Sequence, residues 1–172
     1  MSAAEIDLAL ARIAAEIIEK LSSREEFAII GIRRRGVPLG LRLCEKIQAT
    51  LKRPVLHGVL DITLYRDDLT TIGNRPMLRE TSIEFDVNNL SLVLVDDVLY
   101  TGRTVRSALD GLVDLGRPRR VQLAVLIDRG HRELPIQADY VGKYIQTAED
   151  EIVEVRLMDE DGEERVVLVK KP

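Results

Sequence analysis

The residues best suited to chemistry lie between positions 96 and 104. Two adjacent carboxylates, Asp96 and Asp97, are followed closely by Thr101, Gly102 and Thr104. Threonine hydroxyls, a glycine that lets the backbone approach, and the free N–H groups of a helix start together suit an anion such as phosphate. Because carboxylates repel phosphate, we expect the two aspartates to face sugar hydroxyls or a divalent cation.

A strand and a helix must position these side chains. The apolar run 92–95 predicts a fully buried strand, most often one of a parallel sheet. After residue 104, apolar side chains recur at helical spacing as far as Leu115. Ligands of open α/β sheets bind outside the carboxyl ends of the strands, so this strand, loop and helix predict a binding site. The structural alternative is that Asp96 and Asp97 only end a strand and that Thr101 caps the helix.

A second candidate site is the basic turn between Gly31 and Gly36. It holds Arg33, Arg34 and Arg35 at the end of a predicted buried strand, residues 27–32. Forked guanidinium groups match the oxygens of pyrophosphate, which carries several negative charges. The turn is therefore either a pyrophosphate site or a solubilising surface loop.

Bulk properties predict a cytoplasmic protein with one domain over residues 1–172. Of the 172 residues, 45% are hydrophobic and 31% are charged, which is typical of a folded domain. The N-terminus lacks the pattern of a signal peptide, no apolar run approaches the ~20 residues of a membrane span, and Cys44 is the only cysteine. The net charge is -4, so any nucleic-acid binding must use a local patch. We interpret Cys44 and His57 as structural residues, and the chain has no P-loop motif.

The rest of the chain alternates helical and strand patterns, as in an α/β fold. We expect helices over residues 6–21 and 38–51, strands over 55–64 and 121–127, and a terminal hairpin around the turn 159–162. The segment 65–80 has few apolar residues, and polar segments of this length inside a compact domain are usually functional or disordered. The polar loops after the strands would then meet at one edge of the sheet.

The string at residues 93–104 resembles the phosphoribosyl pyrophosphate (PRPP) motif of type I phosphoribosyltransferases. Further strings at residues 61–68, 116–118 and 127–136 make the resemblance closest to the PyrR family, bifunctional pyrimidine operon attenuators and uracil phosphoribosyltransferases. The resemblance covers nearly the whole chain. It implies an α/β fold with a mainly parallel central sheet flanked by helices, a flexible hood over residues 65–80, and a C-terminal β-hairpin.

The resemblance also implies a reaction, in which uracil and PRPP give UMP and pyrophosphate. It implies that Asp96 and Asp97 act on the ribose, that Arg34 and Arg35 contact pyrophosphate, and that Mg²⁺ binds with PRPP rather than directly to the protein. Purine enzymes of the superfamily carry an acidic residue at the position of Tyr100, so the tyrosine favours a pyrimidine. The implied uracil pocket is Ile127, Asp128 and Arg129, and the implied PRPP contacts are Leu92, Val93, Leu94, Val95, Asp96, Asp97, Val98, Leu99, Tyr100, Thr101, Gly102, Arg103 and Thr104.

The family's second activity is binding to the leader RNA of the pyrimidine operon, favoured by uridine nucleotides. His131 and Lys143 match family positions for this activity, and further cations are available at Lys20, Arg24, Arg129 and Arg132. Three positions depart from the family, because Ala11 and Ala15 stand where threonine and histidine are common, and Gln137 where arginine is common. A plain uracil phosphoribosyltransferase without RNA regulation is therefore the alternative. The resemblance also implies a homo-oligomer, either a dimer or a tetramer.

Overall fold

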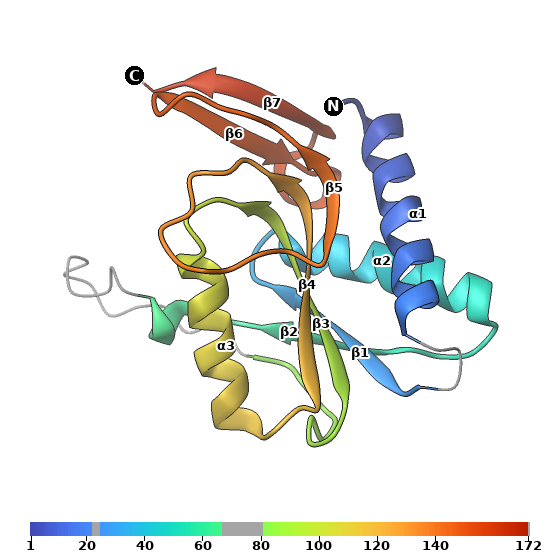
Figure 1. The fold of residues 1–172 in the computed structure, drawn as a ribbon. Helices are drawn as coiled ribbons and strands as arrows, with labels where there is room; N and C mark the ends of the chain where they lie inside the picture. Colours follow the sequence, from blue (N-terminus) through green and yellow to red (C-terminus); the bar gives the residue numbers. More distant parts are fainter. Residues whose placement is uncertain (22–24, 67–80, 172) are drawn as a thin grey trace.

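The computed structural model describes residues 1–21, 25–66 and 81–171. Five parallel strands form the central sheet in the order β2-β1-β3-β4-β5 (Figure 1). The bounds of these strands are β1 Phe27–Ile32, β2 Leu56–Leu60, β3 Ser91–Leu99, β4 Arg120–Asp128 and β5 Tyr140–Tyr144. The predicted α/β fold with a mainly parallel sheet is confirmed, and every pairing in this five-stranded sheet is parallel.

Helices cover both faces of the sheet (Figure 1). The helices α1 (Ala3–Lys20) and α2 (Gly36–Leu51) pack on one face, and α3 (Arg103–Leu115) packs on the other. Along β3, Val93 and Val95 belong to the core on the α1 and α2 side, while Leu92 and Leu94 belong to the core under α3. The run 92–95 is apolar at every position because both faces of its strand are buried.

The helix α1 also protects the sheet at the edge strand β5. It begins at a capping box, in which the Ser2 side chain accepts from the Glu5 backbone and Glu5 accepts from the Ser2 backbone. Arg12 donates to the carbonyl oxygens of Val141 and Gly142, and Lys20 donates to the carbonyl oxygen of Asp139 at 3.1 Å. Backbone carbonyls at the end and edge of the sheet thus have donors from the helix.

The expected C-terminal hairpin is confirmed as β6 (Glu151–Arg156) paired antiparallel with β7 (Arg165–Lys170). Its turn differs from the prediction, because residues 158–161 form a single helical turn, α4 (Met158–Asp161), that ends at Gly162 with φ of 71°. Val153, Val155, Leu157 and Val166 are buried in the core that lies under α1 and α2. The hairpin therefore belongs to that core and lies near the carboxyl ends of the central strands (Figure 1).

Three boundary predictions need correction. The strand β3 does not end before the aspartates but continues through them to Leu99, because Asp96 and Val98 still pair with β4. The strand β2 ends at Leu60, and a single 3₁₀ turn, η1 (Thr63–Tyr65), follows it. The N-cap of α3 is Gly102, with φ of 93° and no side-chain cap, while the hydroxyl of Thr101, one residue earlier, accepts from the Arg103 N–H at 3.3 Å.

The expected hood lies mostly outside the described residues, which include only Tyr65 and Arg66 of residues 65–80. Arg24 also lies outside them. In the parts of the chain that the structure describes, no helix is both long enough and apolar enough to cross a membrane.

Candidate active site

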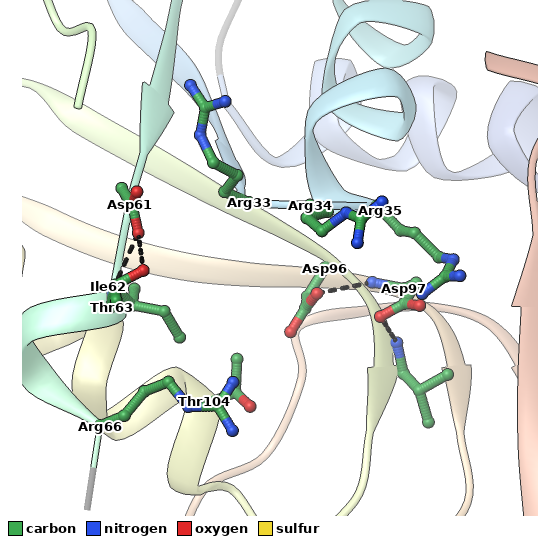
Figure 2. A pocket seen from close by; sticks show the side chains of 11 residues that line it. Arg33, Arg34, Arg35, Asp61, Ile62, Thr63, Arg66, Asp96, Asp97 and Thr104 are labelled. Carbon is green, nitrogen blue, oxygen red and sulfur yellow. Dashed lines mark hydrogen bonds between the residues drawn. The ribbon is translucent and has the colours of Figure 1, made fainter. Parts of the chain in front are cut away.

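A polar cavity of about 380 Å³ opens at the carboxyl ends of β1, β2 and β3 (Figure 2). Its wall combines the basic turn, the paired aspartates and the first turn of α3. The lining residues are Arg33, Arg34, Arg35, Asp61, Ile62, Thr63, Arg66, Asp96, Asp97, Val98 and Thr104. The structure thus brings the predicted pyrophosphate turn and the predicted ribose carboxylates together in one site.

Two glycines let the basic turn lie directly against β3. A Cβ atom on Gly36 would overlap the carbonyl oxygen of Val95, and one on Gly31 would lie 2.6 Å from the carbonyl oxygen of Gly36. No L side chain fits at either position without a backbone shift. This contact sets Arg34 and Arg35 beside Asp96 and Asp97, and the pattern of a glycine on each side of the arginines was its only signal in the sequence.

The two aspartates occupy a poorly hydrated position at the end of β3. Asp96 is only 7% exposed, and its Oδ1 accepts from the backbone N–H of Asp97 at 2.9 Å. Burial raises the pKa of Asp96 well above the ordinary range of a carboxyl group, and the charge of Asp97 raises it further. Burial also raises the pKa of Asp97, but Arg35 and hydrogen bonds such as that from Val98 N–H oppose the rise. The pair therefore resists carrying two negative charges at once.

The loop that follows the aspartates is shaped to expose helix N–H groups. Gly102 has a left-handed backbone, which a glycine adopts without strain, and α3 starts at the next residue. The carbonyl oxygen of Thr101 accepts from Glu133 N–H and Leu134 N–H, and the side chain of Glu133 pairs with Arg103 at 2.6 Å. Of the loop 101–104, Thr104 lines the cavity, and Arg66 extends towards it in Figure 2.

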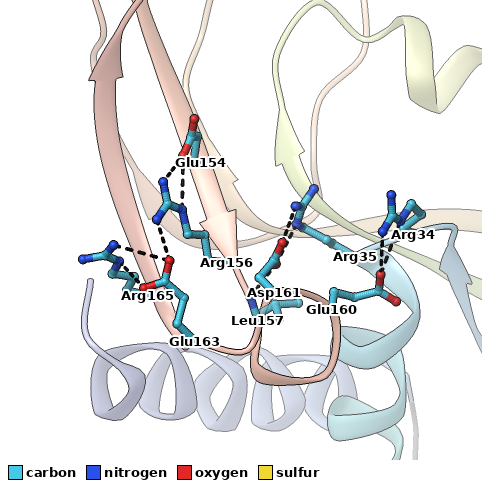
Figure 3. A network of polar contacts seen from close by, with 9 residues as sticks. All are labelled: Arg34, Arg35, Glu154, Arg156, Leu157, Glu160, Asp161, Glu163 and Arg165. Atoms are coloured by element: carbon cyan, nitrogen blue, oxygen red, sulfur yellow. Dashed lines mark hydrogen bonds and ion pairs between the residues drawn. The ribbon is translucent and has the colours of Figure 1, made fainter.

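Acidic residues of the hairpin turn hold the basic turn from outside the cavity (Figure 3). Arg35 makes a bidentate contact with Asp161, at 2.7 Å and 3.2 Å, and Arg34 reaches Glu160 at 3.3 Å. In the sequence, Glu160 and Asp161 are recognisable only as parts of a turn. They lie 126 residues from their partners, and no local pattern could have indicated the contact.

The residues predicted to read uracil lie at the end of β4 and do not line the same cavity. The side chain of Ile127 is fully buried in the core. Asp128 forms a bidentate ion pair with Arg132 at 2.8 Å and 2.7 Å, and Arg129 donates to the carbonyl oxygen of Glu151 at 2.8 Å. The Arg129 guanidinium also stacks 4.1 Å from the centre of the Tyr100 ring.

A second cavity, of about 740 Å³, includes Asp128 and Arg129 in its wall. It is more apolar than the first, with Leu134, Pro135, Ile136 and Tyr144 among its lining residues. Because the Asp128 and Arg129 side chains are engaged in internal contacts, any role for residues 127–129 in base recognition falls mainly to backbone groups.

The described residues predicted for RNA binding differ in exposure, and Arg129 is buried. His131 and Lys143 are exposed, and Nε2 of His131 lies 2.6 Å from the carbonyl oxygen of Thr147. Lys20 lies 4.5 Å above the Tyr140 ring, whereas Arg129 and Arg132 are engaged in the internal contacts described above. The departing residues Ala11, Ala15 and Gln137 are exposed as well.

Cys44 and His57 lie outside the polar cavity. Cys44 is buried, its Sγ donates to the carbonyl oxygen of Val55 at 3.5 Å, and burial raises the pKa of its thiol. Burial lowers the pKa of the partly buried His57, which favours the neutral ring. A neutral thiol and a neutral imidazole in these positions fit packing roles.

Comparison with known proteins defines the class of this fold and site. Residues 2–160 match the model of the phosphoribosyl transferase domain family, and the chain belongs to that family. Within it, the chain belongs to the PyrR proteins. It is 57% identical over 171 residues to the bifunctional protein PyrR of Thermus aquaticus, covering 99% of this chain and 94% of that protein. It is 59% identical over 161 residues to the bifunctional protein PyrR of Pelotomaculum thermopropionicum, covering 94% and 89%.

Solved structures agree on the fold. The hypoxanthine phosphoribosyltransferase of Trypanosoma cruzi superposes with a TM-score of 0.73, covering 100% of this chain and 95% of that one at 19% identity. A hypoxanthine-guanine phosphoribosyltransferase of Bacillus anthracis gives a TM-score of 0.68 at 19% identity, covering 84% and 82%. At these identities the likeness shows the type I phosphoribosyltransferase fold alone.

Proposed function

We propose that this protein transfers the phosphoribosyl group of PRPP to uracil, giving UMP and pyrophosphate, and that it also regulates pyrimidine genes by binding a leader RNA. The observation that carries the enzymatic part is the single cavity that joins the paired aspartates, the basic turn and the start of α3. The family membership supports both parts. The whole chain is proposed to act as one phosphoribosyltransferase domain.

Each wall of the cavity suits one part of PRPP. The N–H groups of the first turn of α3, with the Thr101 and Thr104 hydroxyls, are proposed to bind the 5′-phosphate. Arg34 and Arg35 are proposed to bind the pyrophosphate through charge-assisted hydrogen bonds. Asp96 and Asp97 are left for the ribose hydroxyls, which lie between the two phosphate ends of PRPP.

The reaction breaks the C1–oxygen bond to pyrophosphate and forms a bond from C1 to N1 of uracil, which loses its proton. As the C1–oxygen bond breaks, positive charge develops on the ribose ring, and a neighbouring carboxylate stabilises it. Asp97 is the better candidate for this charge, because Arg35 opposes the rise in its pKa whereas the neighbouring carboxylate increases that of Asp96.

Phosphoribosyltransferases of this type generally work with Mg²⁺, which neutralises charge on the pyrophosphate as it leaves. The oxygen donors of Asp96 and Asp97 suit such a hard cation, and Asp61 also lines the cavity. Mg²⁺ prefers six oxygen ligands, so PRPP oxygens and water would supply most of them. We therefore propose that the metal enters with PRPP and is not held by the protein alone.

Steady-state turnover tests the enzymatic proposal. Uracil, orotate, hypoxanthine and guanine are compared at fixed PRPP and Mg²⁺. Uracil is expected to be the best substrate, because Tyr100 occupies a position where purine enzymes carry an acid. Efficient use of hypoxanthine or guanine would contradict it.

The regulatory part predicts that RNA binding responds to UMP. The exposed Ala11, Ala15 and Gln137 favour the second candidate, a plain uracil phosphoribosyltransferase, because neither alanine side chain has a polar group to bond RNA.

We also propose a homo-oligomer, a dimer or a tetramer, as the PyrR relationship implies.

A further inference from the structure

The two arginines proposed to bind pyrophosphate are both held by the tip of the C-terminal hairpin (Figure 3). Asp161 and Glu160 are consecutive residues of α4, and they face Arg35 and Arg34 respectively. The other ion pairs of the hairpin, such as Glu163 with Arg156, lie further along the strands and do not reach the basic turn (Figure 3). The turn 158–161 is thus the part of the hairpin that contacts the active site.

The two contacts are not equivalent. Asp161 engages Arg35 with both carboxylate oxygens, at 2.7 Å to Nη2 and 3.2 Å to Nε, in a fork-to-fork geometry. Glu160 meets Arg34 with one oxygen at 3.3 Å, and the Arg34 side chain is 61% exposed. Exposed pairs of the second kind contribute little, so Asp161 makes the ordering contact.

Asp161 is itself fixed in place. The backbone N–H of Leu157 donates to its Oδ2 at 2.9 Å, and the Leu157 side chain is buried in the core. The carboxylate is therefore tied to the rigid part of the hairpin and not to a mobile side chain. Arg35 and the Leu157 N–H lower the pKa of Asp161.

The contact leaves Arg35 able to bind a ligand. A guanidinium has five N–H donors, and Asp161 takes one from Nε and one from Nη2. Three donors remain, and Arg35 still lines the cavity beside Asp97. A side chain held by one edge with its other edge free is oriented in advance, which lowers the entropy lost when pyrophosphate binds.

We infer that Asp161 is a positioning residue for pyrophosphate recognition, acting by holding Arg35 in its binding orientation against the cavity wall. This inference rests on the proposed function. The opposite possibility is that Asp161 competes with pyrophosphate for Arg35. The two possibilities predict opposite changes in pyrophosphate affinity when the carboxylate is removed. Loss of a positioning carboxylate weakens pyrophosphate binding, whereas loss of a competing carboxylate strengthens it.

The test is Asp161→Asn, which keeps the size of the side chain and its acceptor for Leu157 N–H but removes the charge. We measure the KM for PRPP, the KM for uracil, and the Kd of magnesium pyrophosphate by calorimetry. The KM for PRPP and the Kd for pyrophosphate should each rise about fivefold, while the KM for uracil changes less than about twofold. Unchanged or tighter pyrophosphate binding would overturn the inference.

Glu163→Gln is the matched control, since it removes the same charge from the same hairpin but acts on Arg156 and Arg165. It should leave both PRPP and pyrophosphate binding unchanged. If it weakens them as much as Asp161→Asn does, a general effect of hairpin charge or stability explains the result and the positioning role is wrong.

A second variant, Asp161→Glu, guards against failure to fold. It keeps the charge but moves the carboxylate by one methylene, and it should weaken pyrophosphate binding less than Asp161→Asn.

A double-mutant cycle with Arg35→Lys adds a further criterion, because effects through one shared contact are not additive. Calorimetry also separates the two proposals. A wild-type protein that binds neither PRPP nor pyrophosphate overturns both, whereas binding that is insensitive to Asp161 overturns only the positioning role.

Discussion

Asp96 and Asp97 are adjacent in the chain but have different surroundings. Asp96 is buried next to another carboxylate, and both features raise its pKa. Asp97 lies nearer to Arg35, which opposes the effect of burial on its pKa. Keeping two carboxyl groups in this position is unfavourable for the unliganded fold, as is common at sites built to bind a charged substrate.

Asp96→Asn is expected to stabilise the unliganded protein and to lower uracil turnover. The amide keeps the acceptor for Asp97 N–H but has no charge to bury. The gain in free energy of unfolding should be about 1 kcal/mol or more at pH 8, and turnover should fall about tenfold or more through lost electrostatic stabilisation. Urea unfolding and initial rates measure the two effects.

The predicted difference in stability between wild type and Asp96→Asn depends on pH. The pKa of Asp96 is raised in the folded state, so folded Asp96 keeps its proton to a higher pH than unfolded Asp96. Wild-type stability therefore declines as the pH rises from the ordinary pKa of an aspartate to the raised one, and the difference from Asp96→Asn grows with it. Asp150→Asn, at an exposed position, serves as control. A variant no more stable than wild type at pH 8 would show that burial of Asp96 carries no penalty.

Among the secondary-structure elements, the geometry of the proposed active site depends on how closely the basic turn approaches β3. The turn connects β1 to α2, and Gly36 places its backbone against Val95. The hairpin turn α4 packs against the same turn from the other side, through Asp161 and Arg35. The proposed pyrophosphate site thus lies between β3 and the hairpin, and displacement of the turn should weaken PRPP binding more than uracil binding.

Gly36→Ala is expected to weaken PRPP binding strongly, because the added Cβ would overlap the Val95 carbonyl oxygen and push the turn outward. The KM for PRPP should rise about tenfold or more, and the free energy of unfolding should fall by roughly 1 to 3 kcal/mol, as in overpacked sites. Substrate kinetics and urea unfolding measure both.

Ile17→Ala is a control for lost stability alone, since Ile17 is buried in α1 and does not line the cavity. It should lower stability by about 2 to 5 kcal/mol without changing the KM for PRPP. If Gly36→Ala and Ile17→Ala changed the KM for PRPP equally, the close contact between Gly36 and Val95 would have no specific role in PRPP binding.

The net charge of the whole protein limits where RNA could bind. The net charge is -4, so RNA must meet a local group of cations. Two predicted cations are engaged internally, since Arg129 donates to the Glu151 carbonyl oxygen of β6 and Arg132 pairs with Asp128. Lys143 is exposed at the end of β5 and is the strongest remaining candidate.

Lys143→Gln is expected to weaken leader RNA binding and to reduce its salt dependence by about one phosphate contact, a change of about 0.7 in the slope of log K against log salt. Uracil turnover should stay nearly unchanged, because Lys143 does not line the polar cavity. Filter binding across a salt series, with and without UMP, gives both quantities.

Lys52→Gln, an exposed lysine just after α2, removes the same charge at a distance and should not change the slope. RNA binding that does not change with UMP, with Lys143→Gln or with salt concentration would support the plain uracil phosphoribosyltransferase over the bifunctional regulator.

The amino-acid sequence was sufficient to predict the strand, loop and helix of residues 91–115, the basic turn, the α/β fold and the family. The structural features depend on side-chain periodicity and turn residues within a few positions of one another, whereas the family was identified only from the resemblance of its motifs. The extent of β3 could not be predicted in this way, because the strand continues through the two polar aspartates, and Asp96 and Val98 still pair with β4.

Which charged residues pair with one another could be seen only in the folded chain. Asp161 lies 126 residues from Arg35, and an acidic turn in the sequence fits a solvated surface equally well. The fold also turns the side chains of Asp128 and Arg129 to Arg132 and to the Glu151 carbonyl oxygen. Such pairings depend on how the hairpin and the loops pack on the sheet, and an ion pair between distant segments has no periodic signal in the chain.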